Sequence, residues 1–306
     1  MRAVRLSKIG TLRAAPRKLE LPMRLSVLAA ALAALASTTP ALAERDPQSG
    51  APLPPAPRDP GSPITDHFDI RASWSAPQLR TNLRVDPSNP APGVTGTPVS
   101  AESDLGLPQR KHLGRVDFMF RMRERGRVRV DYLEVDRSGS ATLAHDIVFN
   151  NETFAAGQVA QASLDWRQFD ITYTYSFIRN RHFELGTGLA MYFLEVDAIG
   201  AVPAQRQRQE VSAATPFPAL PLDATWRISS RWSVSGRAAY LKAHISGFRG
   251  WYADQHEDLQ YRCNPYFVLG LGYSSTRSSL SRRGGSFPGM ANVSISGPEA
   301  FFRFSY

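Results

Sequence analysis

Fourteen charged residues carry most of the potential chemistry of this sequence, because each lies on the polar side of a stretch in which apolar and polar residues alternate. We expect all fourteen to point into one enclosed interior: Asp69, Asp117, Asp131, Asp170, Glu184, Asp223 and Glu299, with Arg71, Arg121, Arg129, Arg227, Arg237, Arg262 and Arg303. Confined charges need partners, and arginine can bind a carboxylate through two hydrogen bonds. Equal numbers of acids and arginines favour an interior filled by salt bridges. An ion-selective channel or a proton relay is the alternative.

The histidines suggest a different, catalytic interpretation. We expect four of them near an exposed rim, where acids accompany the last: His112, His145, His244 and His256, with Asp254, Glu257 and Asp258. An Asp–His pair at a rim could activate water for proteolysis, and a Ser-His-acid set could deacylate lipid A. The sequence contains no strict catalytic motif, and ordinary polar loop residues explain the same pattern. We therefore predict no catalytic residue.

We also predict that the protein has neither a metal site nor a cofactor. The single cysteine, Cys263, cannot form an intrachain disulfide. A structural zinc site of the cysteine type needs several thiolates, so that kind of site is excluded as well.

The elements that must position these residues are strands. From residue 67 onward, apolar and polar residues alternate with a period of two, as they do along 168–177, and this period is typical of β-structure. The pattern predicts ten strands, near 68–84, 111–123, 126–137, 158–178, 181–197, 216–228, 231–247, 253–263, 266–281 and 292–306. Eight or twelve strands are alternatives. The first strand must accommodate Ala76-Pro77 through a bulge or a kink.

Two features favour a transmembrane barrel over a soluble sandwich. The polar face carries full charges in mid-strand, whereas the apolar face is rich in aromatic residues, which fits a lipid-facing exterior and a polar lumen. The predicted connections also alternate between tight turns and longer loops at 86–110, 139–157, 198–215, 248–252 and 283–291. The sequence therefore predicts an all-β fold, an antiparallel up-and-down barrel that places both of its ends on the same side of the membrane.

Two further segments precede the predicted barrel, which spans 67–306. Residues 1–43 are typical of a secretory signal peptide, with Arg24, an apolar stretch at 25–35 and Ala41-Leu42-Ala43 as the cleavage site; Met23 is an alternative start. Residues 44–66 contain seven prolines and predict a disordered tether.

The formal charge of +9 would suggest nucleic acid as a partner. However, residues 1–43 carry +6 of this charge and the remainder only +3. We therefore predict no nucleic-acid partner.

The last seven residues, Ala300 to Tyr306, end on an aromatic side chain and place Phe302 and Phe304 at alternate positions before Tyr306. This segment resembles the C-terminal targeting signal of bacterial outer-membrane barrels, and 67–306 resembles small barrels of the broad OmpA/OmpW-like kind. The resemblance implies an outer-membrane location. It also implies contact with membrane lipid and lipopolysaccharide, and recognition by the barrel-assembly machinery during biogenesis.

The function that we predict is that of a non-enzymatic barrel with a largely closed lumen and surface loops that contact the envelope or a ligand. A narrow channel for small solutes is the first alternative. A barrel enzyme that modifies lipid A or cleaves proteins is the second. The sequence does not indicate the oligomeric state.

Overall fold

The computed structural model describes residues 61–87, 95–203, 207–245, 248–282 and 289–306, so the predicted signal peptide and most of the predicted tether lie outside the described residues. The described part is built from strands: β1 (Phe68–Ser75), β2 (Gln78–Val85), β3 (Val99–Ser100), β4 (Leu113–Met122), β5 (Gly126–Thr142), β6 (Ile147–Phe149), β7 (Glu152–Phe154), β8 (Val159–Arg179), β9 (Phe183–Val202), β10 (Gln207–Arg227), β11 (Trp232–Ile245), β12 (Phe248–Arg262), β13 (Phe267–Arg282) and β14 (Gly289–Ser305). Among these residues, none forms a helix long and apolar enough to cross a membrane.

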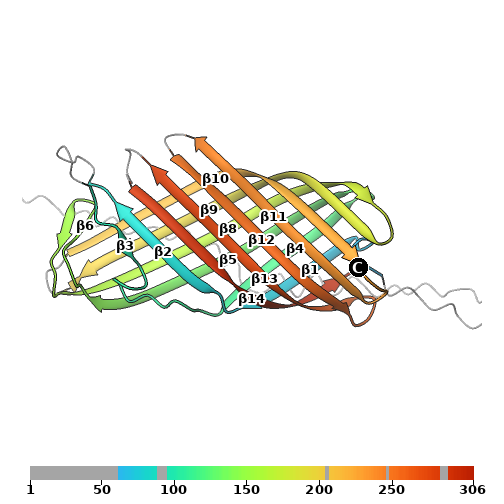
Figure 1. Ribbon diagram of the computed structural model, residues 1–306, viewed down its shortest axis with the longest axis horizontal. Coiled ribbons are helices and arrows are strands. Elements are labelled where there is room, and N and C mark those ends of the chain that lie inside the picture. The colour runs from blue at the N-terminus through green and yellow to red at the C-terminus, as the bar shows by residue number, and fades with distance from the viewer. Residues whose placement is uncertain (1–60, 88–94, 204–206, 246–247, 283–288) are drawn as a thin grey trace, which may run out of the picture. The chain divides into compact units, whose positions relative to one another are not determined.

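The strands form a closed antiparallel barrel (Figure 1). From β4 to β14, the wall strands pair in sequence order: β4, β5, β8, β9, β10, β11, β12, β13 and β14. The ring closes where β1 pairs with β4 on one side and with β14 on the other. Since β1 and β2 both pair with β14 and occupy one position in the wall, the barrel has ten strands. The predicted fold class and strand number are confirmed.

The interruption between β1 and β2 lies at Ala76-Pro77, as predicted. Ser75 pairs with Glu299 and Gln78 with Ser296, so the register against β14 continues across the break and no residue is bulged out. Proline has no N–H for the ladder. Opposite it stands Gly297, where an added Cβ would come within 2.6 Å of the Pro77 Cα. The proline therefore interrupts the strand without shifting it.

The connections define two ends of the barrel. Four short turns and the C-terminus mark one end, which we call the turn end: the turns at 123–125, 180–182, 228–231 and 263–266. The opposite, loop end carries residues 86–87, 95–112 and 143–158, and the last of these segments includes the β6–β7 hairpin. Two loops predicted at this end, 198–215 and 248–252, are largely strand instead. Apolar and polar residues do not alternate regularly along these two segments of the sequence, although the strands continue.

The outer wall is apolar over a limited height. Along β8 the outward side chains are large and exposed from Phe169 to Phe177, and they give way to Arg167, which pairs with Glu134 and Glu195 on the neighbouring strands at 3.4 and 3.2 Å. At about 3.3 Å per residue and a tilt of about 40°, the apolar stretch spans about 20 Å. This is close to the apolar band, about 25 Å tall, that faces lipid in outer-membrane barrels.

Gly270 generates a prediction about packing inside the wall. Its Cβ, if present, would lie 2.1 Å from the Phe301 ring, whereas a Cβ at Gly236, on the outward face of β11, meets nothing within 4 Å. Gly270→Ala should lower the free energy of unfolding by about 1–3 kcal/mol, the usual cost of overpacking. Gly236→Ala should change it by less than about 0.5 kcal/mol. Equal effects in urea unfolding from lipid vesicles would contradict this account.

Candidate functional site

The structure places all fourteen of the predicted charged residues on the inner face of the wall. Eleven are buried, and three arginines, Arg129, Arg227 and Arg237, are partly exposed. They do not form isolated pairs. Together with charged residues that the sequence analysis did not single out, they form a continuous network from the turn end to about the middle of the barrel.

Arg71 lies at the centre of this network. Its guanidinium donates to Asp258 at 2.8 Å and to Glu299, and it lies over the Phe301 ring, 3.5 Å from the centroid. Phe301 in turn occupies the space that Gly270 leaves open. One arginine thus joins β1, β12 and β14 through two carboxylates and an aromatic face, and such contacts are favourable where water is excluded.

Asp117 connects three arginines. Arg71, Arg129 and Arg237 each approach one of its carboxylate oxygens at 3.8 Å, which is an ion-pair distance and longer than a hydrogen bond. Arg129 also reaches Asp223 at 3.3 Å. Asp117 and Asp223 therefore link opposite parts of the wall across the lumen.

Glu184 anchors the network near the turn end. Its two carboxylate oxygens accept from Arg121 at 2.7 and 3.0 Å, and Ser176 Oγ donates to it at 2.6 Å. Both Glu184 and Arg121 have fully buried side chains. A bidentate pair that is completely removed from water is stable only while both partners are present.

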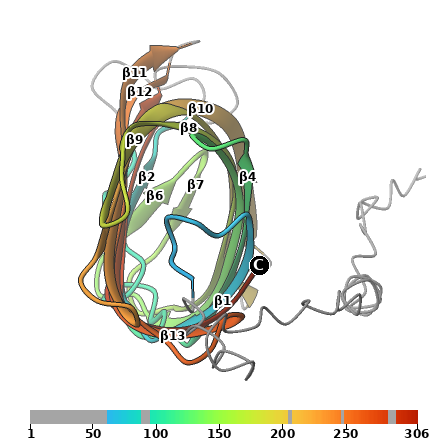
Figure 2. The same ribbon diagram turned by 90° about the vertical axis from the view of Figure 1, so that its right-hand side faces the viewer.

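The turn end is closed by residues 61–66, and this corrects the predicted boundary of the tether. Rather than belonging to a disordered segment, these six residues form a turn inside the lumen, where Ile64 is 2 % exposed. Arg121 donates to the carbonyls of Asp66 and Pro63 at 3.0 and 3.3 Å. The Asp66 carboxylate pairs with Arg262. Figure 2 shows this segment, in blue, crossing the interior of the ring of strands.

The residues of this segment explain why the turn forms here. Ser62 Oγ accepts from the Ile64 amide at 3.0 Å, and the Ser62 carbonyl accepts from the amides of Thr65 and Asp66. The turn therefore satisfies its own backbone while directing the Ile64 side chain into the lumen. The arginines of the wall bind the carbonyls that are left.

His256 requires a second correction, because the structure does not place it at a rim. It lies in the middle of β12 and is 3 % exposed. Its Nε2 lies 3.4 Å from Asp254 and its Nδ1 3.6 Å from Glu299. Arg115 links the same region to Asp131 at 2.7 Å and to Asp254 at 3.3 Å. The histidine is thus part of the buried network.

The other three histidines of the predicted rim are exposed. His112 stacks on Trp74 with ring centroids 4.9 Å apart, and His145 and His244 are exposed. Within the described ranges, no group of three or more His, Cys, Asp or Glu side chains could hold a metal ion.

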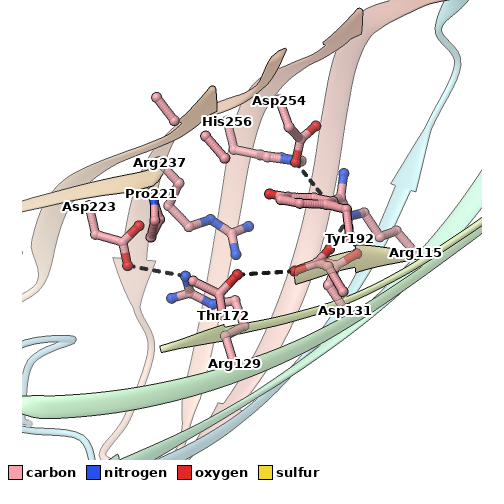
Figure 3. A pocket seen from close by; sticks show the side chains of 13 residues that line it. Arg115, Arg129, Asp131, Thr172, Tyr192, Pro221, Asp223, Arg237, Asp254 and His256 are labelled. Carbon is pink, nitrogen blue, oxygen red and sulfur yellow. Dashed lines mark hydrogen bonds and ion pairs between the residues drawn. The ribbon is translucent and has the colours of Figure 1, made fainter. Parts of the chain in front are cut away.

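Two small polar cavities lie within the network, each of about 30 Å³. Figure 3 shows the one beside His256, around which Arg115, Arg129 and Arg237 point toward the surrounding acids. Both cavities are lined by Arg129, Asp223 and Arg237. Each has room for a few water molecules, at roughly 10–15 Å³ per water. This part of the lumen can hold water but has no open bore.

Toward the loop end the network gives way to an apolar layer, which was not predicted from the sequence, and beyond this layer a separate buried pair joins Arg137 to Glu102. Tyr252, fully buried, donates to Gln168 at 3.0 Å and packs on Tyr192 with ring centroids 4.7 Å apart. Around them lies a cluster of inward side chains that fills this level of the barrel: Leu79, Leu113, Leu133, Val135, Trp166, Leu194, Phe217, Val293 and Ile295. Ions have no polar path through this layer.

Several members of the network are not among the fourteen predicted residues, although the alternation of side chains along their strands indicates an inward position. Arg115 and Arg127 lie two positions before Asp117 and Arg129, on the same strand face. Asp254, His256 and Asp258 continue the inward face of Arg262, but Gln255 and Glu257 face outward and are also polar. With polar residues on both faces, the period of two disappears from the sequence. Strand parity extended from Arg262 would have recovered these residues.

The buried pair at Glu184 gives a test of the network. Glu184→Gln should lower the free energy of unfolding by about 3 kcal/mol or more, because it leaves the Arg121 charge buried without its counter-ion. Glu195→Gln is the matched control: its pair with Arg167 is more than 40 % exposed on both sides, and it should cost about 1 kcal/mol or less.

A double variant, Arg121→Met with Glu184→Gln, should be less destabilised than Glu184→Gln alone, since it removes the unpaired charge. Urea titration in lipid vesicles measures all four proteins. If Glu195→Gln cost as much as Glu184→Gln, burial of the pair would not be the source of its importance.

Comparison with known proteins gives similarities to solved structures only. No family model matches the chain, and no curated protein matches it. The outer membrane protease OmpT of Escherichia coli is similar over 78 % of this chain and 97 % of its own, with 10 % identity and a TM-score of 0.47. The attachment invasion locus protein Ail of Yersinia pestis is similar over 78 % and 99 %, with 8 % identity and a TM-score of 0.35.

The translocator domain of the autotransporter NalP of Neisseria meningitidis is similar over 78 % of this chain and 88 % of its own, with 8 % identity and a TM-score of 0.39. With TM-scores below 0.5, these similarities do not bear on function. The strand pairing of the chain itself establishes its fold, that of a closed ten-stranded antiparallel β-barrel.

Proposed function

We propose that this protein is a non-enzymatic, non-conducting β-barrel of the bacterial outer membrane, whose loop end contacts the envelope or a ligand. The single observation that carries the proposal is that the chain itself obstructs the lumen at three successive levels. Residues 61–66 occupy the turn end, the salt-bridge network fills the middle, and the apolar cluster around Tyr252 follows. A pore would need a continuous polar path, and the described residues offer none.

The proposed location is supported by the outer surface. The exposed side chains of the wall form an apolar, aromatic-rich exterior, for example Phe118, Tyr173, Trp226, Leu271 and Phe302. Such a surface is unfavourable in water over this area and suits lipid. In this orientation the turn end faces the periplasm and the loop end faces the exterior.

The enzymatic alternative has less support. The residues of the Asp254–His256 pair are 5 % and 3 % exposed, with the apolar cluster on one side and the salt-bridge network on the other. A catalytic pair must reach its substrate, and a lipid or peptide has no route to this one. The small-solute channel remains the alternative that the conductance experiment decides.

Location can be tested by cell fractionation. The protein should be recovered with the outer membrane, and on a denaturing gel the unboiled sample should migrate differently from the boiled one. A closed wall has no free strand edge and resists detergent until it is heated. Recovery as a soluble periplasmic protein with no such shift would contradict the membrane assignment.

Conductance tests the closed lumen. The purified full-length mature protein, inserted into a planar lipid bilayer in concentrated potassium chloride, should give no stable current steps. A general porin inserted under the same conditions serves as the positive control. Regular steps that scale with the amount of inserted protein would show instead that the barrel is a channel.

A further inference from the structure

A cavity of about 50 Å³ lies inside the barrel near the loop end, separate from the polar cavities described above. Its walls come from β8 and β9, from the segment 101–107 beside β2, and from the β6–β7 hairpin. Leu83, Leu107, Leu164, Ala198 and Phe154 are buried side chains that line it. By volume alone, several water molecules would fit.

The chemistry of the lining argues against water. The inward side chains around the cavity are aliphatic or phenyl groups, drawn from two apolar clusters. The polar residues that border it on β8, Gln161 and Ser163, occupy positions that alternate with the buried Ala160, Ala162 and Leu164. A buried water needs two to four polar partners. An apolar molecule instead gains dispersion contacts with a lining that otherwise faces empty space.

The β6–β7 hairpin covers the cavity at the loop end. Figure 2 shows both strands within the outline of the ring. Ile147 and Phe154 are buried on the hairpin's inner side, and its turn begins at Asn150, whose φ of 57° is a conformation that asparagine tolerates well. Each strand has only three residues, and a two-stranded hairpin of this size has little stability of its own.

Hydrogen bonds join the hairpin to Thr97 and to the end of β2. Among the described residues, the Thr97 amide donates to the Val148 carbonyl at 2.9 Å, and the Asn150 amide donates to the Val85 carbonyl at 3.1 Å. The Val148 amide donates to Thr97 Oγ1 at 2.9 Å. An element with strands of only three residues can open locally at a small fraction of the cost of unfolding the barrel.

From this combination we infer that the cavity is a binding site for a small neutral hydrocarbon, which enters from the loop end when the β6–β7 hairpin opens. Charged and strongly polar molecules are excluded, because the lining offers no partner for them. The inference goes beyond the proposed function, since a barrel that conducts no ions can still bind an apolar molecule beneath one of its loops.

Gly200 provides the variant that tests the site. It borders the cavity, and a Cβ built on it meets nothing within 4 Å, so a larger side chain can enter the cavity without displacing a neighbour. Gly200→Leu should fill the site, and the smaller Gly200→Ala should fill part of it. Gly236→Leu is the matched control, because a Cβ at Gly236 also meets open space but faces outward from the barrel.

The experiment uses crystals of the full-length mature protein under xenon pressure, with xenon as the first probe and n-hexane as the second. Xenon should occupy the cavity in the unchanged protein and in Gly236→Leu, its occupancy should be lower in Gly200→Ala, and it should be absent from Gly200→Leu. Prior soaking with n-hexane should reduce xenon occupancy at least tenfold. Soaking with octanoate tests whether the alkyl tail of an amphiphile is admitted as well.

The outcomes separate the sources of the hydrocarbon. Displacement by n-hexane alone assigns the site to small neutral molecules, and displacement by both probes adds the tails of amphiphiles. Three results would overturn the inference: no xenon in the unchanged protein, undiminished xenon in Gly200→Leu, or xenon that neither n-hexane nor octanoate displaces. The last of these results would identify a packing void that admits xenon but neither of the two hydrocarbon probes.

Discussion

Closure of the wall is the constraint on which the rest of this structure depends. In a closed antiparallel barrel every second side chain of every strand points into a single enclosed volume. Here that volume receives many charges, and each must find its partner within it. Among the described residues ten acids are buried, Asp66, Asp69, Asp117, Asp131, Asp170, Glu184, Asp223, Asp254, Asp258 and Glu299, and so are seven arginines, Arg71, Arg115, Arg121, Arg127, Arg137, Arg262 and Arg303. An unpaired buried charge costs several kcal/mol, so these charges need partners. Since several of the partners lie across the lumen, this pairing joins opposite sides of the wall.

Much of this arrangement follows from the sequence. Where strands lie within the apolar band, an apolar exterior on one side and a polar lumen on the other impose the period of two, so the strand number, the Pro77 interruption and the direction of all fourteen charges could be predicted. Where polar residues occupy both faces of a strand, as at Gln255 and Glu257 beside Asp254 and His256, the period of two fails. The sequence therefore indicates a rim position for Asp254 and His256, and it indicates a loop at 198–215, where the alternation is irregular.

The pairing itself could not be predicted, because it depends on which strands face each other across the lumen. Arg71 and Asp258 are 187 residues apart, and Arg121 and Glu184 are 63 apart. No local pattern relates such positions. The burial of residues 61–66 could not be predicted either, because Ile64 is the only large apolar residue in that turn and the prolines before it predict a tether. Its burial follows from arginines on β4 and β8 that need carbonyl acceptors.

Charge balance alone does not close a lumen, since opposite charges on facing walls can also line a water-filled bore. In the proposed closed barrel, side-chain volume closes the lumen. Phe301 turns inward over Gly270, Ile64 enters from the turn end, and Tyr192 and Tyr252 meet at the level where the salt-bridge network ends. Each of these side chains is large and apolar or aromatic, at a position where a channel would carry a small or polar residue. The salt bridges join the strands across the interior, whereas in the proposed non-conducting barrel these four residues interrupt the continuous column of water that conduction would need.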